Sequence, residues 1–506
     1  MGNNNTLIIG GGLGGLFTGA ILTKEGYRVT VLEKNAVSGG GLQCFRRYGE
    51  LFETGMHLLG GLQEGGNVYK ICRYLGIISQ LDIKPTDSDS ISSVTYQTDG
   101  KTYFIPKGRK AFEAYLCKEF PEEAAGVRGY VREIYSLSDE VQLFHLRKGG
   151  DSIARHSPEF YMSADELIAA FVQSPRLRDL LAFMNPMYGG VPGHTPAYIH
   201  ALINVLYIEG TSQFVGGSQQ MADALCHVIT DGGGRVVCGD AVSKVDVADR
   251  MVSKVITEKG KEYSADIYIS SIHPCSLLEL VGESSFHKAY RTRLSELPNS
   301  YSCFSVYLKF KPASVPYVNY PRYFLEQDNA AWRLSDTANE AWPIGFMCLT
   351  PPPCPNPQWA SHMTINCLMP FDDVRRWVNT TVGRRGQDYN EWKERTMNKV
   401  LEKVERFMPG IMGHVEHSFA SSPLTIRDYY GTKEGAIYGF QRDCRNLLKS
   451  QVPIATKIKN LLLAGQNINL HGICGVPLTS IEVAEAILGK GVVLDKINND
   501  SKQVDK

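Results

Sequence analysis

The hydrophobic pattern at the start of the chain predicts a strand, a helix and a second strand. Residues 7–9, LII, form a short and continuously apolar run, which is typical of a buried strand. Apolar residues then recur at helical spacing from about Leu13 until Gly26 ends the pattern. Residues 28–32, RVTVL, are rich in valine and indicate another strand. Together these elements predict a βαβ unit.

Between about residues 67 and 213 the pattern is mixed and mostly helical. The segments ELIAAFVQS and RLRDLLAFM show helical periodicity, and Ser174-Pro175 separates them. The segment PAYIHALINVLYIEG is apolar nearly all round, so its helix is expected in the core or in the wall of an apolar cavity.

Residues 301–310, YSCFSVYLKF, follow a different period. Hydrophobic and polar positions alternate with period two here, which predicts a strand with two different faces. One face carries Phe304, Val306, Leu308 and Phe310, and the other carries Tyr301, Cys303, Ser305 and Tyr307.

The last patterned segment, NLLLAGQNINLHGICGVPLTSIEVAEAILGKG, predicts a strand, a glycine-rich turn and a helix. Pro477 suits the first position of that helix, because the N–H that proline lacks has no partner there. The N-terminus of such a helix would direct the positive end of its dipole at a bound group and stabilise an anion. Residues 496–506 are polar and predict a disordered tail.

A glycine-rich sequence joins the first strand to the first helix. Gly10, Gly12 and Gly15 fit the pattern GxGxxG. In that pattern the first glycine permits a tight turn, the second lets the backbone approach a phosphate, and the third lets the helix pack on the strand. Glu33 ends the second strand, where a carboxylate accepts hydrogen bonds from ribose hydroxyls. The alternative is a turn that only packs the helix closely, but the surrounding strand, helix and acid favour a dinucleotide site.

A second glycine cluster, Gly39 to Gly41, follows Glu33 and favours FAD over NAD. It provides a second backbone loop that can close over a cofactor longer than one βαβ unit binds. A 2′-phosphate beside Glu33 would be repelled, which disfavours NADP at this site. The sequence has no second GxGxxG with its own acid, so no separate nicotinamide domain is expected. Free NAD(P)H acting on the flavin is one candidate for the reductant.

Composition narrows the classes further. The 506 residues exceed what one hydrophobic core holds, so two or more domains are expected. Lys+Arg and Asp+Glu are both 53, a balance that gives no support to a nucleic-acid partner. The twelve cysteines form no CxxC pair and no zinc-like spacing with histidine, so we expect no metal site and reduced thiols in a cytoplasmic protein. No apolar run reaches about 18 residues, so no spanning helix is expected.

Several segments resemble one superfamily of flavoproteins. The segment GGGLGGLFTGAILTKEGYRVTVLEKN, with the glycine cluster after it, resembles the FAD signature of the phytoene desaturase, carotenoid isomerase and amine oxidase superfamily. The segments FETGMHLLGG, SSPLTIRDYYGTKEGAIYGF and LLLAGQNINLHGICGVPLTS are similar to bacterial relatives of retinol saturase (all-trans-retinol 13,14-reductase). The resemblance is vague between residues 67 and 213, where substrate choice is expected to reside.

The resemblance implies an α/β fold. A Rossmann-like FAD/NAD(P)-binding domain of the amine oxidase/phytoene desaturase type is expected over residues 1–75, 215–285 and 445–495, with a discontinuous mixed α+β substrate domain over 76–214 and 286–444. The residues at the family's motif positions, expected to contact FAD, are Gly10, Gly12, Leu13, Gly14, Gly15, Glu33, Lys34, Gly40, Gly41, Leu42, Val242, Gly465, Gln466, Val476, Pro477 and Leu478.

Two histidines are candidates for proton transfer. His57, after Gly55, and His471, before the last helix, are both expected beside the flavin, where imidazole can donate or accept a proton near neutral pH. The alternative for His57 is a structural hydrogen bond to the backbone. Cys474 can in principle form a flavin adduct, but packing is the favoured interpretation. The sequence carries no nucleophile elbow and no paired-carboxylate motif, so the chemistry is expected to be that of the flavin.

These features predict an FAD-dependent oxidoreductase that acts on the C=C or C–C bonds of an apolar, carotenoid- or retinoid-like polyene by hydride or electron-pair transfer. Saturation, desaturation and isomerisation stay open, as does the electron partner: quinone, oxygen or free NAD(P)H. The alternatives are an amine oxidase-type flavoenzyme and a non-catalytic prenyl- or lipid-binding protein on the same fold. Because polyenes dissolve in bilayers, a peripheral contact with the inner face of a membrane is a further hypothesis, made through the helix that carries Arg176 and Arg178. A soluble helical cap is its alternative.

Overall fold

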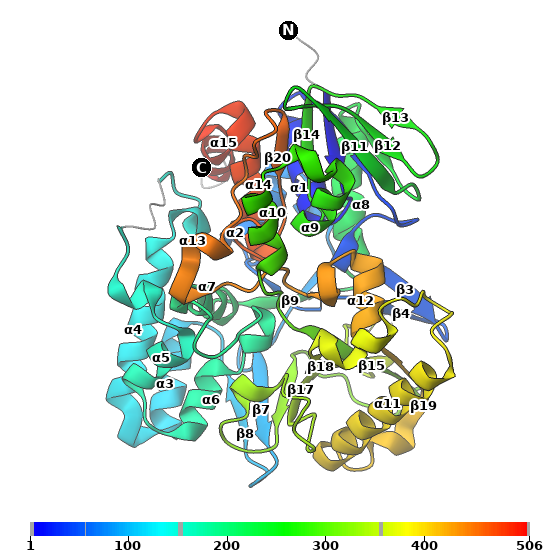
Figure 1. The fold of residues 1–506 in the computed structure, drawn as a ribbon. Helices are drawn as coiled ribbons and strands as arrows, with labels where there is room; N and C mark the ends of the chain where they lie inside the picture. Colours follow the sequence, from blue (N-terminus) through cyan, green and yellow to red (C-terminus); the bar gives the residue numbers. More distant parts are fainter. Residues whose placement is uncertain (1–4, 56, 150–154, 354–357, 503–506) are drawn as a thin grey trace.

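Two sheets organise the chain (Figure 1). The computed structural model describes residues 5–55, 57–149, 155–353 and 358–502. A five-stranded sheet forms one half of the molecule and a seven-stranded sheet forms the other. In Figure 1 segments from the start, the middle and the end of the chain come together in the upper half, above the seven-stranded sheet.

The five-stranded sheet has the order β10-β2-β1-β14-β20, and all its neighbouring strands are parallel. Helix α1 packs against both α8 and α14 on one face of the sheet, and Val245, Val252 and Leu277 pack against the other, so the sheet is buried on both faces. The elements are β1 (Asn5–Ile9), α1 (Leu13–Lys24), β2 (Arg28–Leu32), α8 (Gln219–Asp231), β10 (Arg235–Val237), β14 (Ile267–Ser270), β20 (Leu461–Leu463) and α14 (Gly472–Leu488). Each of the three segments predicted for the FAD domain supplies at least one strand, and the predicted fold class is confirmed; the domain boundaries stay a prediction.

The seven-stranded sheet has the order β19-β15-β18-β17-β16-β7-β8. The pair β16 and β7 is parallel and the other neighbours are antiparallel. Its strands are β7 (Ser92–Tyr96), β8 (Thr102–Ile105), β15 (Ser302–Phe310), β16 (Arg322–Leu325), β17 (Gly345–Leu349), β18 (His362–Met369) and β19 (Val415–Ser421).

Helices pack beside both sheets, and smaller sheets connect them. The remaining α-helices are α2 (Asn67–Leu75), α3 (Arg109–Glu119), α4 (Ala124–Glu140), α5 (Ala164–Phe171), α6 (Pro175–Ala182), α7 (Ala197–Ile208), α9 (Pro274–Val281), α10 (Lys288–Glu296), α11 (Gln387–Phe407), α12 (Pro423–Tyr430), α13 (Leu447–Ser450) and α15 (Val492–Lys502). The remaining strands are β3 (Cys44–Arg47), β4 (Glu50–Glu53), β5 (Leu59–Gly60), β6 (Ile83–Pro85), β9 (Thr211–Phe214), β11 (Val242–Ala248), β12 (Met251–Thr257) and β13 (Glu262–Tyr263).

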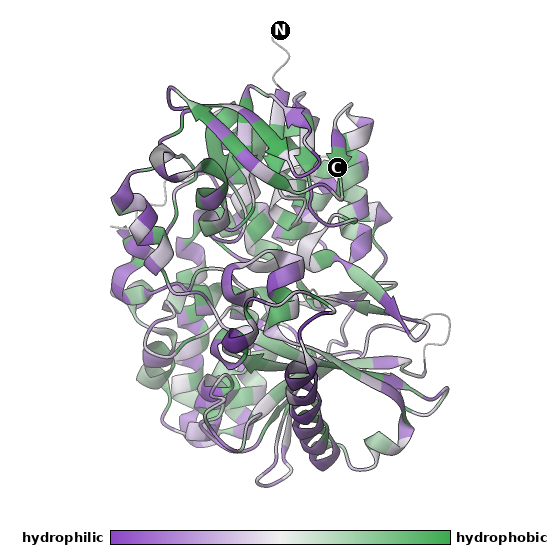
Figure 2. Ribbon diagram, turned by 45° about the vertical axis from the view of Figure 1, so that its right-hand side comes forward, coloured by the Kyte–Doolittle hydropathy of each residue, from purple (hydrophilic) through white to green (hydrophobic). Residues whose placement is uncertain are grey.

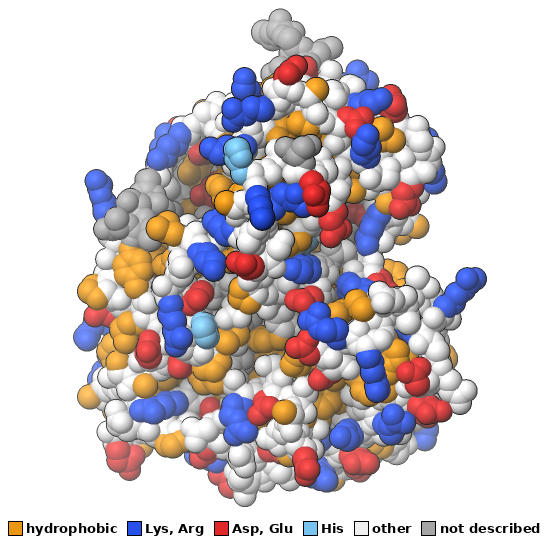
Figure 3. All heavy atoms as spheres, viewed as in Figure 1, with side chains coloured by type: hydrophobic (Ala, Val, Ile, Leu, Met, Phe, Trp, Pro, Cys, Tyr) orange, Lys and Arg blue, Asp and Glu red, His pale blue; other side chains and the backbone are white. Residues whose placement is uncertain are grey.

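Buried hydrophobic side chains form cores that pack against both large sheets. Figure 2 shows hydrophobic residues concentrated on the strands and on the helices that cover them, with hydrophilic residues on outer helices and turns. On the face drawn in Figure 3, basic and acidic side chains are interspersed, in keeping with a formal net charge of zero. Within the described ranges, no helix combines the length and hydrophobicity needed to cross a membrane.

Most predicted elements are confirmed. The first βαβ unit, the two helices separated by Ser174-Pro175 and the nearly all-apolar helix are β1-α1-β2, α5, α6 and α7. Strand β15 has the two predicted faces, since Phe304, Val306, Leu308 and Phe310 belong to one buried cluster.

The prediction that Pro477 begins the last helix is wrong. Helix α14 begins at Gly472, and Pro477 lies inside it. Gly472 and Gly475 have low helix propensity, so the sequence did not indicate the first turn of this helix. Tertiary packing overrides the low propensity, because Ile473, Cys474 and Val476 are all buried.

The predicted disordered tail is also wrong for residues 496–502. Helix α15 includes them, Ile497 is fully buried, and Lys496 forms an ion pair with Glu25 of α1. The polar composition concealed one apolar stripe that packs on the protein. Residues 503–506 lie outside the described residues.

The helix predicted to touch a membrane is instead an internal element. Leu177, Leu180 and Leu181 of α6 are buried in the protein, so they offer no apolar face to a bilayer. Arg176 forms ion pairs with Asp99 and Asp328. These contacts favour the alternative of a helical cap for this segment.

Candidate active site

The glycine-rich turn after β1 leaves space for a ligand at one glycine and excludes side chains at two others. A Cβ on Gly15 would lie 2.0 Å from the carbonyl oxygen of Gly10, and one on Gly14 would lie 2.7 Å from Cα of Gly465. A Cβ on Gly12 would meet only Cα of Gly40, at 3.9 Å. Gly12 is also the N-cap of α1, with no side chain bonded to the free N–H groups of the first turn. These N–H groups and the open face of Gly12 fit a phosphate.

Glu33 fixes the turn from the end of β2. Its Oε2 accepts a hydrogen bond from the Gly11 N–H at 2.7 Å, and its Oε1 accepts one from the Asn35 N–H at 2.8 Å. The carboxylate is buried beside the glycine-rich turn, and each oxygen retains a lone pair for another donor, such as a ribose hydroxyl.

A cavity of about 500 Å³ runs from this turn to the seven-stranded sheet. We call its two ends the dinucleotide end, at β1, α1 and β2, and the sheet end, at β15–β18. Most of the predicted cofactor residues line it: Gly10, Gly12, Leu13, Gly14, Glu33, Lys34, Gly40, Gly41, Leu42, Val242, Gly465, Gln466 and Val476. Gly15, Pro477 and Leu478 do not line it, because they pack α1 and α14 behind the wall.

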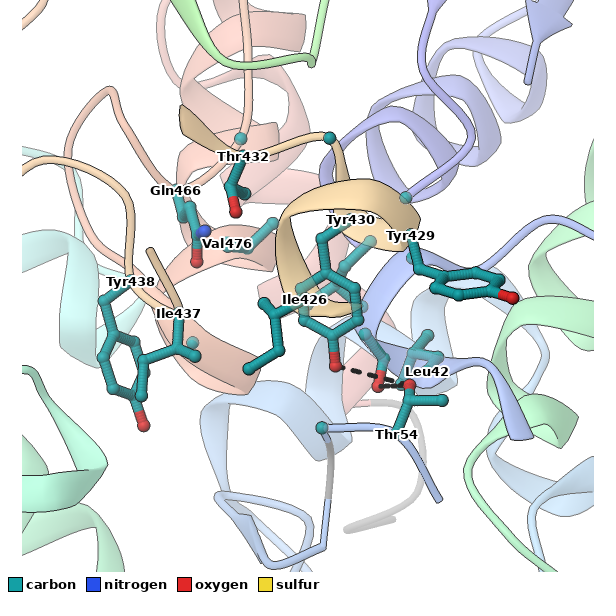
Figure 4. A pocket seen from close by; sticks show the side chains of 18 of the residues that line it. Leu42, Thr54, Ile426, Tyr429, Tyr430, Thr432, Ile437, Tyr438, Gln466 and Val476 are labelled. Atoms are coloured by element: carbon teal, nitrogen blue, oxygen red, sulfur yellow. Dashed lines mark hydrogen bonds between the residues drawn. The ribbon is translucent and has the colours of Figure 1, made fainter. Parts of the chain in front are cut away.

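A segment that we call the strap, residues 422–440, covers the middle of the cavity. Figure 4 shows Tyr430 of α12 directed at Thr54, and their hydroxyls lie 3.3 Å apart. A Cβ on Gly55 would lie 1.9 Å from the Tyr430 hydroxyl, so glycine is required for this fit. Lys34 Nζ donates to the Asp428 carbonyl at 2.6 Å and burial lowers the pKa of Lys34. Its side chain therefore holds the C-terminal end of α12, a place that favours a cation.

The sheet end is predominantly apolar and aromatic. Leu325, Phe346, Met347 and Leu368 line it from the sheet. Tyr207, Tyr323 and Tyr438 add aromatic rings, and burial raises the pKa of all three, so they remain neutral phenols. Such a surface fits an apolar ligand.

His57 lines the cavity, and its place beside a flavin stays a prediction. Its Nδ1 lies 3.3 Å from Oε2 of Glu53, four residues earlier, and both side chains are 9% exposed. The carboxylate orients the imidazole and leaves Nε2 for another partner. The bond to a carboxylate differs from the backbone bond considered for a purely structural role.

His471 does not line the cavity. It is the N-cap of α14, its ring lies 5.0 Å from that of Tyr438, and burial lowers its pKa to about 3. A neutral, enclosed imidazole at this position argues against the predicted proton transfer. Burial likewise raises the pKa of Cys474 to about 12, which keeps the thiol protonated and supports its packing role.

Several cavity residues were not identified from the sequence. The strap supplies Ile426, Tyr429, Tyr430, Thr432 and Ile437, and the sheet end includes Ser305 and Asn366. The alternation in residues 301–310 separated the two faces of β15 but contained no signal for which face meets a ligand. The segment SSPLTIRDYYGTKEGAIYGF was the available signal for the strap, through its resemblance to other proteins alone.

Comparisons with known proteins agree with this geometry. The model of a family described as flavin containing amine oxidoreductase matches residues 13–488. The chain is 28% identical to the all-trans-retinol 13,14-reductase of Homo sapiens, over 98% of this chain and 88% of that protein. It is 23% identical to the chloroplastic prolycopene isomerase 1 of an Oncidium hybrid cultivar, over 86% of this chain and 75% of that protein. An oxidoreductase from Methanosarcina mazei shares the fold, with a TM-score of 0.65 at 17% identity over 95% of this chain and 100% of that one.

Proposed function

Because the chain belongs to the flavin containing amine oxidoreductase family, we propose that it is an FAD-dependent oxidoreductase that acts on carbon–carbon bonds of an apolar polyene. The observation that carries this proposal is the continuous cavity, which joins a dinucleotide end to an apolar sheet end. A retinol reductase and a prolycopene isomerase among its relatives support a retinoid- or carotenoid-like substrate.

The bound flavin would supply hydride or electron-pair exchange with a carbon of the substrate. The first turn of α1 and the open face of Gly12 would bind the pyrophosphate, and Glu33 would accept hydrogen bonds from the ribose. The N-terminus of α14, whose Gly472 and Ile473 line the cavity, would favour negative charge nearby. The walls of the sheet end would exclude water and align the chain of the substrate.

We propose that His57 donates or accepts the proton that accompanies hydride or electron-pair transfer. Its Nδ1 bonds Glu53, so Nε2 is the atom that would hold or release a proton toward the cavity. Saturation needs a proton donor, desaturation needs a proton acceptor, and isomerisation needs no net proton transfer, so assays of a His57→Gln variant would distinguish these reactions. Loss of net reduction with flavin binding intact would support proton transfer from His57.

The alternatives are less well supported. The carboxylates that line the cavity within the described ranges, Glu33 and Glu279, both lie in the half that contains the parallel sheet, so the sheet end offers no acid to pair with an amine substrate. A non-catalytic lipid carrier would not need the glycine contacts and Glu33, which are intact.

An anaerobic absorbance spectrum tests the proposal. The protein is expected to bind FAD, and its flavin bands should bleach or recover when retinol or phytoene is added. Free NADPH added in the same cuvette tests the proposed reductant. Flavin bands that ignore every polyene would reject the substrate class, and failure to bind FAD would reject the cofactor.

We also propose that the mouth of the cavity contacts a membrane, in place of the rejected helix α6. Tyr429 supports this location, since it lines the cavity and is 48% exposed, and Val378 is exposed as well. Arg427 beside it bonds the Val378 carbonyl, which brings two of these segments together. Cosedimentation with liposomes should fall for Tyr429→Ser, and equal binding of both proteins would reject this surface.

A further inference from the structure

Four strands contribute one row of side chains to the sheet end of the cavity. In the sheet register Ser305 of β15 is opposite Asn366 of β18, Asn366 is opposite Met347 of β17, and Met347 is opposite Tyr323 of β16. All four residues line the cavity. Residues in register across neighbouring strands point to the same face, so this row crosses the floor of the sheet end.

The row is polar on one side and apolar in its centre. Ser305 Oγ donates to Asn366 Oδ1 at 2.7 Å, and Cys303 Sγ lies 3.8 Å from the same oxygen. These two donors occupy the acceptor oxygen of the amide. Its NH₂ group is then the part of Asn366 that can still form a hydrogen bond with a ligand. Within the described ranges, no hydrogen bond from this NH₂ group is formed, and Asn366 is the single residue of β18 that is not fully buried.

An amide donor in an apolar cavity favours a ligand with an acceptor oxygen, because a desolvated donor without a partner is unfavourable. The charge of that oxygen is limited by its surroundings. Lys34 is the one lysine or arginine among the described residues that line the cavity, and its Nζ is engaged with α12 at the dinucleotide end. Among these described residues, a carboxylate would find no lysine or arginine at the sheet end, whereas a hydroxyl or carbonyl needs none.

We propose that Asn366, positioned by Ser305 and Cys303, is a subsite for an uncharged oxygen function, a hydroxyl or carbonyl, on the substrate. This subsite rests on the proposed function and narrows it. It selects a polyene alcohol, aldehyde or ketone over both the bare hydrocarbon and the free acid.

Binding to the oxidised, FAD-loaded protein under anaerobic conditions tests the subsite, with tryptophan fluorescence as the readout. The ligands are retinol, retinal, retinoic acid and the C20 hydrocarbon of the same polyene chain. Retinol and retinal are expected to bind about tenfold more tightly than the hydrocarbon, the difference expected for one hydrogen bond. They should also bind more tightly than the acid, because its charge would be buried without a lysine or arginine. Asn366→Leu should abolish the preference over the hydrocarbon while hydrocarbon binding is retained. Met347→Leu, in the same row, is the matched control and should preserve it.

A second variant keeps the test decisive if leucine disturbs the strand. Asn366→Asp has the same shape but lacks the NH₂ donor, so it should weaken retinal, which can only accept, more than retinol, which can also donate. Unchanged ligand ratios in both variants would overturn the subsite while the polyene function stands. Absence of binding by every polyene to the wild-type holoprotein would overturn the proposed function and the subsite together.

Discussion

The dinucleotide end of the cavity is lined mainly by the backbone of two glycine-rich turns, whereas the sheet end is lined by side chains of four strands. These two turns lie between Gly10 and Gly41, and their geometry follows from where a Cβ fits. The second set depends on the register between β15, β16, β17 and β18. The comparison teaches that the two glycine-rich turns are specified locally, whereas the sheet end is specified by tertiary packing.

The largest expected effect is that of Gly15→Ala, which attacks the packing of the dinucleotide end. The new Cβ would lie 2.0 Å from the Gly10 carbonyl oxygen, so the turn must move. We expect the free energy of unfolding to fall by about 3 kcal/mol and FAD binding to be lost. Urea unfolding and FAD titration measure both. Gly413→Ala is the control, because its Cβ meets nothing within 4 Å; equal stability of the two variants would contradict the packing argument.

Gly12→Ala should separate ligand contact from folding at the same turn. Gly12 has φ −79° and ψ −176°, which alanine adopts, and its Cβ meets only Cα of Gly40 at 3.9 Å. The apoprotein should therefore unfold as the wild type does, while the affinity for FAD falls at least about tenfold because the methyl group occupies the approach of the phosphate. Unchanged affinity in an FAD titration would show that the cofactor does not pass over this glycine.

These two glycines also show how far the sequence could lead. The spacing of Gly10, Gly12 and Gly15 and the position of Glu33 predicted the turn, because each role depends on a missing side chain or a strand end. By contrast, nothing near Asn366 in the sequence indicates that it lies opposite Ser305, 61 residues away. Register, and the choice of which strand face meets the cavity, are decided by the packing of the whole sheet.

A smaller effect is expected where the strap joins the two ends. Gly55→Ala would place a Cβ 1.9 Å from the Tyr430 hydroxyl, and we expect a loss of about 2 kcal/mol in the free energy of unfolding. Tyr430→Phe removes that oxygen and leaves the ring carbon at 3.1 Å. In the Tyr430→Phe background, Gly55→Ala should cost at least about 1 kcal/mol less. Additive losses in the double-mutant cycle would mean that Tyr430 does not rest on Gly55.

The smallest expected effect concerns pH and a buried carboxyl group of helix α6. Asp179 of α6 accepts hydrogen bonds from the N–H groups of Ala330, at 3.0 Å, and Ala331, at 3.3 Å. Burial raises its pKa to about 7, although the two backbone donors oppose the shift. Since the folded pKa lies above the unfolded one, the stabilisation is complete below about pH 4 and is lost as the pH rises through about 7.

Between pH 6 and pH 8 the wild type should therefore lose about 1.4 kcal/mol more unfolding free energy than Asp179→Asn, which does not titrate. Urea unfolding of both holoproteins at equal FAD concentration measures the difference. Burial lowers the pKa of four histidines, His200, His273, His362 and His471. Their contribution to the stability of the protein is lost only as the pH falls below about 6.5. They are common to both proteins and cancel in the difference. Parallel pH profiles would mean that Asp179 is ionised in the folded protein. Its backbone donors, rather than burial, would then determine the pKa of Asp179.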